Sequence, residues 1–227
     1  MKIQFLGSGG AFSDFRKNYH NNALIHAPEG YILLDCGMTA GQSLKELGVH
    51  PTELLGILIT HIHGDHSCPE PLVWERYYSS PKGFPAFMTT PLYGMDDVII
   101  PLQRSLEPFI GIFTAQNGEV QNNGHEELLE LHIGKTHSLG GLEFTFFPVP
   151  HIENEKYRKP AYGIRIVYGE KVIYWSGDSQ FEPSWINKAA ADPAVEAIFH
   201  ECAFYPKFPG TAHCHWSELL SLPEQTK

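Results

Sequence analysis

Short apolar runs, separated by turn residues, dominate the chain. The runs are rich in Ile, Leu and Phe, and Gly, Pro or Asn interrupts them, which is the pattern of short β-strands. This pattern predicts strands at residues 2–7, 22–27, 31–35, 55–60, 84–90, 127–133, 142–149, 161–168, 171–175 and 196–199.

Helical spacing of apolar residues is less frequent than strand-like runs. It predicts a short helix over 39–47 and a longer one near 95–107, whereas 70–80 reads as helical or irregular. Many short strands and few helices, closely spaced, indicate two packed sheets with helices outside. Residues 111–126 are rich in Gly and Asn, and we expect a mobile loop or lid there.

The composition is that of a globular enzyme. Of the 227 residues 42% are hydrophobic and 19% charged, which suffices for a sizeable core, and we expect one domain over residues 1–227. Residues 219–227 end as an unfinished helix and turn, so we expect the C-terminal end of that domain to be missing. No window approaches the roughly 20 apolar residues of a membrane helix, and the N-terminal apolar run is too short for a signal peptide.

Cysteine spacing indicates the cellular compartment, and net charge restricts the class of binding partner. The four cysteines form no Cys-x-x-Cys pair, which argues against a zinc ribbon or a disulfide-rich secreted domain and favours a reducing cytoplasm. The net charge of -10 disfavours a large nucleic-acid partner, because phosphate contacts supply most of such affinity. A small phosphorylated substrate remains compatible.

Four ligand-type side chains follow the apolar run Gly56-Ile57-Leu58-Ile59-Thr60. His61 and His63 stand two apart, so in an extended segment both face one side and can bind one ion. Gly64 then permits a turn that directs Asp65 and His66 to a second ion. This density of metal-binding side chains directly after a strand predicts a two-metal site.

The His-x-His-x-Asp-His loop resembles the signature of the metallo-β-lactamase superfamily. The resemblance implies an α/β fold, a four-layer αββα sandwich with two divalent ions at one edge of its sheets. His151 matches the third histidine of the first metal site, and Asp178 matches the aspartate that bridges both ions. Asp35, before Cys36-Gly37, is similar to an aspartate that orients ligand histidines, although a plain strand-to-helix turn explains it equally well.

Two later stretches resemble the transfer-RNA 3′-processing nucleases and related phosphodiesterases. His200-Glu201-Cys202-Ala203 is similar to their His-Glu-Ala-Thr motif, and His213-Cys214-His215-Trp216-Ser217 to their His-Ser-Thr motif. We expect Ser217 to cap a helix that begins at Glu218. We favour His215 as the matching histidine, and His213 stays the alternative.

The resemblance also implies roles for these residues. Asp65 is expected to handle the proton of the attacking water, and His215, oriented by Glu201, to protonate the departing oxygen. The family's last ligand histidine has no counterpart before Lys227. Either the C-terminal end is missing, which we favour, or His213 or His215 replaces that ligand, so the second metal site is less defined. Lys156, Arg158 and Lys159 form the one dense basic run and either contact the substrate phosphate or belong to a solvated loop.

The separation of His151 and Asp178 favours a small substrate. Only 26 residues lie between them, too few for the basic arm that transfer-RNA processors insert there. The chain is therefore most similar to the phage anti-Pycsar phosphodiesterases, which open the 3′,5′ ring of cyclic nucleotides to linear monophosphates. The alternatives are a transfer-RNA 3′ endoribonuclease, a β-lactamase or thioesterase, which would leave the later motifs unexplained, and a non-catalytic binding scaffold.

The resemblance further implies two divalent ions, zinc first and manganese second, because His and carboxylate ligands suit both. It also implies a homodimer in which the 111–126 segment reaches the partner's site.

Overall fold

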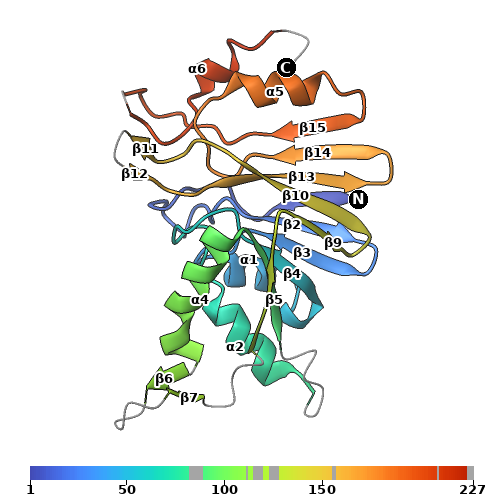
Figure 1. Cartoon of the computed structure of the whole chain (residues 1–227), viewed down its shortest axis with the longest axis vertical. Helices are drawn as coiled ribbons and strands as arrows, with labels where there is room; N and C mark the ends of the chain where they lie inside the picture. Colours follow the sequence, from blue (N-terminus) through green and yellow to red (C-terminus); the bar gives the residue numbers. More distant parts are fainter. Residues whose placement is uncertain are drawn as a thin grey trace. The chain divides into compact units, whose positions relative to one another are not determined.

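The computed structural model describes residues 1–81, 89–110, 112–114, 120–122, 128–154, 157–208 and 210–223. The chain folds as two compact units, Met1–Gly134 (unit 1) and Lys135–Lys227 (unit 2). Each unit contains one large β-sheet with helices (Figure 1). Two sheets with few helices agree with the α/β class that the sequence predicts.

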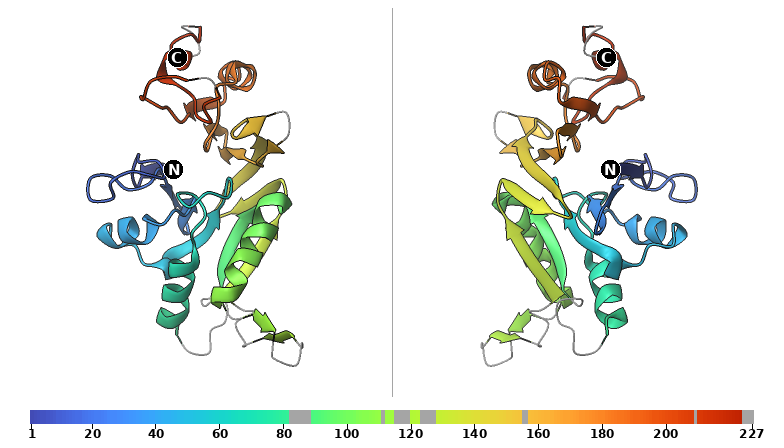
Figure 2. Two further views of the ribbon diagram at one scale, coloured as in Figure 1. Left: turned by 90° about the vertical axis from the view of Figure 1, so that its left-hand side faces the viewer. Right: turned by 90° about the vertical axis from the view of Figure 1, so that its right-hand side faces the viewer.

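Unit 1 contains a six-stranded sheet in the order β1-β2-β3-β4-β5-β8. The helix α4 lies beside β5 and β8 (Figure 2). The elements are β1 (Lys2–Phe5), β2 (Ala23–Ala27), β3 (Gly30–Leu34), α1 (Ala40–Glu46), a 3-10 helix (Pro51–Glu53), β4 (Leu54–Leu58), α2 (Glu70–Ser79), β5 (Thr90–Gly94), α4 (Asp96–Ile110), the paired strands β6 (Ile112–Thr114) and β7 (Val120–Asn122), and β8 (Leu129–Ile133).

Unit 2 contains a five-stranded sheet in the order β15-β14-β13-β10-β9, and α5 lies beside β15 (Figure 1). Its elements are β9 (Thr136–Leu139), β10 (Leu142–Pro148), the short pair β11 (Glu153–Asn154) and β12 (Tyr157–Arg158), β13 (Tyr162–Tyr168), β14 (Lys171–Trp175), α5 (Pro183–Ala190), β15 (Val195–Phe199) and α6 (Trp216–Leu219).

Burial follows from the sequence pattern of the strands. In β10 Leu142, Phe144 and Phe146 are buried and alternate with Glu143 and Thr145, as in a strand that covers a core with one face. In β3 and β4 consecutive residues are buried, which explains their unbroken apolar runs. The alternating strand and the unbroken runs were both visible in the sequence.

Most predicted elements are confirmed, although one helix is longer than predicted and some elements were missed. The predicted helix 95–107 continues to Ile110, past Pro108, although proline inside a helix removes a backbone hydrogen bond. The sequence reading missed β9 and α5, the latter beginning at Pro183, where a proline in the first turn loses no helix hydrogen bond. Most of the predicted strand 84–90 lies outside the described residues.

The predicted lid, 111–126, also falls mostly outside the described residues, and of it only the β6 and β7 backbones are described. Among the described helices none is long and apolar enough to cross a membrane.

The fully buried Phe144 side chain supports a stability prediction. Phe144→Ala is expected to lower the free energy of unfolding by about 3–5 kcal/mol, because it removes a large apolar side chain and leaves a cavity. Urea denaturation followed by circular dichroism would measure the change. Phe204→Ala is the matched control, since Phe204 is 78% exposed, and its stability should change by less than about 0.5 kcal/mol.

Candidate metal ligands and acid–base pair

Parallel pairing brings the polar residues of unit 1 to one edge of its sheet. Strands β3 and β4 are parallel, with Leu34 opposite Leu58. Asp35 follows the first strand and Thr60 and His61 follow the second, so they emerge at the same edge. The carboxyl ends of parallel strands are where ligands commonly bind in such sheets.

The Asp35 carboxylate organises this edge. It is fully buried and accepts hydrogen bonds from the Thr60 backbone N–H at 2.8 Å and from the Thr60 hydroxyl, at 2.9 Å to each carboxylate oxygen. Its Oδ2 also lies 2.8 Å from His66 Nδ1. Asp35 has a φ of 58°, in the left-handed region that asparagine and aspartate tolerate best. The structure thus supports the orienting role over the plain turn.

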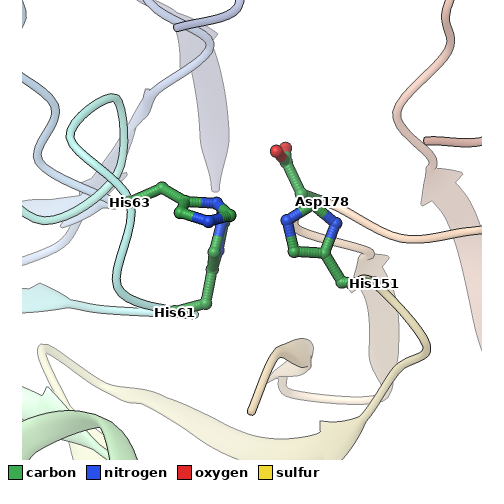
Figure 3. Close-up of side chains that lie close together, drawn as sticks. All are labelled: His61, His63, His151 and Asp178. Atoms are coloured by element: carbon green, nitrogen blue, oxygen red, sulfur yellow. The ribbon is translucent and has the colours of Figure 1, made fainter. Parts of the chain in front are cut away.

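The imidazoles of the His-rich loop turn their ring nitrogens toward one another. His61 Nε2 lies 2.9 Å from His63 Nδ1, and His66 Nε2 lies 3.5 Å from Asp65 Oδ2. Figure 3 shows the His61 and His63 side chains extending from this loop. His61 Nδ1 contacts the Thr60 hydroxyl at 3.1 Å, which orients the His61 ring.

Asn22 is a residue of this edge whose role the sequence did not reveal. Its side-chain amide donates to the Asp65 carbonyl at 3.0 Å and accepts from the Gly37 N–H at 2.9 Å, so it ties the two loops together. Gly37 has to be glycine, because a Cβ there would lie 2.1 Å from the Asp65 carbonyl oxygen. The Asn21-Asn22 pair in the sequence was the available signal.

In unit 2 three strand ends converge in a similar way. Strand β14 is parallel to β15, and both β14 and β10 are antiparallel to β13, so β10, β14 and β15 all end at one edge. His151 follows β10, Asp178 follows β14 and Glu201 follows β15. The sheet therefore gathers three residues that stand up to 50 positions apart in the chain.

Backbone contacts fix His151 and its neighbours. His151 Nδ1 donates to the Ala212 carbonyl at 3.0 Å, which orients the imidazole ring, and the Gln180 side-chain amide donates to the His151 carbonyl at 2.7 Å. Both His151 and Asp178 are buried, and Figure 3 labels these two side chains also. A histidine whose second nitrogen binds a carbonyl is the usual arrangement of a metal ligand.

The structure pairs Glu201 with His213. Glu201 Oε2 lies 2.7 Å from His213 Nδ1, and that nitrogen is 3.7 Å from Asp178 Oδ2. The other Glu201 oxygen accepts from the Ser179 N–H. Burial raises the pKa of Glu201 to about 7, although the hydrogen bond with His213 opposes the shift.

His215 has a different position from the one expected. The helix α6 begins at Trp216, and its N-cap is His215, whose Nδ1 accepts from the Ser217 N–H at 3.3 Å and contacts the Ser217 hydroxyl at 2.7 Å. The prediction that Ser217 caps the helix is therefore wrong, and so is the predicted contact between Glu201 and His215. An imidazole that accepts from the backbone can replace the usual serine or threonine cap, and nothing in the sequence indicated this.

The basic run is only partly described. Lys156 lies outside the described residues, whereas Arg158 is exposed in β12 and Lys159 is half-buried beside it. Their predicted contact with a phosphate stays a prediction.

The donor sets of both units fit divalent ions. In unit 2 one ligand atom each of His151, Glu201 and His213 lies within 4.8 Å of the others. In unit 1 the imidazoles are oriented by Thr60 and by the buried carboxylate of Asp35. Neutral imidazoles and carboxylates, with their other atoms hydrogen-bonded, are the ligands that zinc and manganese accept.

The model of one protein family, described as "Anti-Pycsar protein Apyc1", matches residues 1–227. The chain belongs to this family. A member from Paenibacillus sp. (strain J14) is 31% identical over 229 residues, which cover 99% of this chain and 85% of the relative.

Solved structures show the metallo-β-lactamase fold. The metallo-β-lactamase fold protein YhfI from Bacillus subtilis has a TM-score of 0.69 and 20% identity, with 94% of this chain and 76% of that protein covered. The short form of human tRNase Z has a TM-score of 0.69 and 16% identity, with 97% of this chain and 87% of that protein covered. The predicted family and fold are both confirmed.

The Asp35 network leads to a prediction about metal affinity. Asp35→Asn should weaken binding of Zn²⁺ by about 10-fold to 100-fold, because the amide no longer holds the His66 imidazole as a carboxylate does. Titration of the metal-free protein against a chromogenic chelator would measure the affinity. Asp14→Asn is the control, since the Asp14 carboxylate pairs with the surface residues Arg16 and Lys17. Equal affinities in both variants would rule out the orienting role.

Proposed function

We propose that this protein is a metal-dependent phosphodiesterase that hydrolyses 3′,5′-cyclic nucleotides to linear nucleoside monophosphates, and that a phage or its host uses it against cyclic-nucleotide immune signalling. The observation that carries the proposal is the match of the whole chain to the anti-Pycsar family. The acid–base residues of unit 2 and the histidine loop of unit 1 supply groups that such a reaction needs.

The proposed ligands are the side chains that the sequence singled out. His61, His63 and His151 would hold one divalent ion, Asp65 and His66 the other, and Asp178 would bridge them. Bound there, two divalent ions would lower the pKa of a water molecule and neutralise charge on the phosphate. The buried carboxylate of Asp35 keeps the His66 ring in place for this purpose.

Proton transfer is assigned to side chains near these ligands. Asp65, 5% exposed, would accept the proton of the attacking water while its oxygen attacks phosphorus. The bond from phosphorus to one ribose oxygen then breaks, and that oxygen needs a proton. The 2.7 Å contact with Glu201 supports His213 as the donor, whereas His215 already caps α6.

The charge of the chain supports a small substrate over transfer RNA. A net charge of -10 opposes the many phosphate contacts that a folded RNA requires at physiological salt. Only 26 residues separate His151 from Asp178, and most of those that the structure describes belong to β11, β12 and the β13–β14 hairpin, so the segment is too short for a separate RNA-binding arm.

The first test is a substrate panel with the metal-loaded protein. Cyclic AMP, GMP, CMP and UMP should be converted to linear monophosphates, and precursor transfer RNA should remain intact. His61→Ala and Asp178→Ala should abolish hydrolysis, as should chelation, whereas His132→Ala, in a partly exposed pair with Glu130, should not. Products are followed by chromatography. Cleavage of the RNA with intact cyclic nucleotides would reverse the assignment.

The second test separates His213 from His215. Glu201→Gln and His213→Ala should lower kcat by about 100-fold to 10,000-fold, the usual contribution of a general acid. His215→Ala should lower the thermal stability by removing the cap of α6 and affect kcat less. Metal content, measured by plasma emission spectroscopy, shows whether His213 acts as a proton donor or as a ligand. A large loss of kcat in stable His215→Ala alone would restore the sequence-based choice.

A further inference from the structure

Unit 2 contains a pocket that the roles above do not use. Its volume is about 450 Å³, within the range of about 300–1,000 Å³ typical of small-molecule sites. His213 forms part of its lining, so the pocket adjoins the Glu201–His213 pair. Its lining residues are Gln180, Phe181, Lys207, Phe208, Gly210, Thr211, His213 and Glu218.

Aromatic rings supply part of the pocket's lining, and one of them is braced. Phe208 stacks on Tyr205, with ring centroids 5.8 Å apart and an interplanar angle of 26°. The Tyr205 hydroxyl contacts Thr211 Oγ1 at 3.0 Å, which ties this ring pair to the segment that leads to His213. Phe208 is nevertheless 54% exposed, so much of its ring is accessible to a ligand.

The charged groups of the pocket neutralise each other. Lys207 Nζ lies 2.7 Å from Glu218 Oε1, and the second Glu218 oxygen accepts from the His215 N–H at 2.9 Å. The Gln180 amide nitrogen is already bound to the His151 carbonyl. The pocket therefore presents aromatic and neutral polar surface, which suits a flat heterocycle better than a phosphate.

We propose that this pocket binds the nucleobase of the substrate, with Phe208 as the ring on which the base stacks. The inference rests on the proposed function, because it places the phosphate beside His151 and His213 and the base next to it. Stacking on an aromatic side chain tolerates any base, since every base has a π-face. Purine and pyrimidine cyclic nucleotides should therefore differ in KM by less than about tenfold.

Two substrates separate base binding from phosphate chemistry. One is cyclic AMP, and the other is ribose 3′,5′-cyclic phosphate with hydrogen in place of the base. Phe208→Ala should raise KM for cyclic AMP about 10-fold, as expected for loss of one stack, and leave kcat within about twofold. Its kinetics with the base-free substrate should not change. Phe208→Trp should restore the KM for cyclic AMP.

Phe204→Ala is the matched control, because Phe204 lies on the same loop, is 78% exposed and does not line the pocket. Calorimetric titration of metal-free protein with cyclic AMP gives a second readout that needs no turnover. Weaker binding by Phe208→Ala than by Phe204→Ala supports the pocket, and equal binding overturns it. If the wild-type protein hydrolyses neither substrate, the proposed reaction fails, and the calorimetric result alone decides whether the pocket binds the base.

Discussion

The buried carboxylate of Asp35 is the interaction on which the His61–His66 loop of unit 1 depends. An aspartate that is fully removed from water is costly unless several donors reach it, and here the Thr60 N–H, the Thr60 hydroxyl and the His66 imidazole do so. The same contacts that stabilise the charge also determine where His66 and the start of the loop lie. The same hydrogen bonds therefore stabilise the buried carboxylate and orient the His66 imidazole.

In both units, parallel neighbouring strands bring polar residues from distant parts of the chain together. Asp35 and Thr60 meet because β3 and β4 are parallel neighbours. Glu201 likewise meets the Ser179 N–H because β14 and β15 are parallel neighbours. In each unit the hydrophobic residues that build the sheet lie within the strands, and the polar residues begin where the strands end. The hydrophobic core therefore determines where the polar side chains of the candidate site lie, although the core residues are not part of that site.

The segment after β15 combines three tasks in a few residues. Glu201 contacts His213, His215 caps α6, and Phe208 and Thr211 line the pocket next to His213. Because Glu218 binds both the His215 N–H and Lys207, the cap and the rim of the pocket share one carboxylate. A substitution at Glu218 would consequently disturb the cap and expose an unpaired lysine at the pocket.

The sequence by itself determined the class of fold, most strands and the candidate metal ligands, because each of these depends on a local pattern of residue types. Alternating or unbroken apolar runs specify strands, and the spacing from His61 to His66 marks a candidate ligand loop. Only the tertiary structure shows that His213 contacts Glu201 and that His215 caps α6 instead. Their sequence context is nearly the same, and the choice depends on where α6 begins and on which ring faces Glu201 across 12 positions of chain. The contacts of Asn22 and the pocket beside Phe208 likewise came only from the structure, since they join segments far apart in the chain.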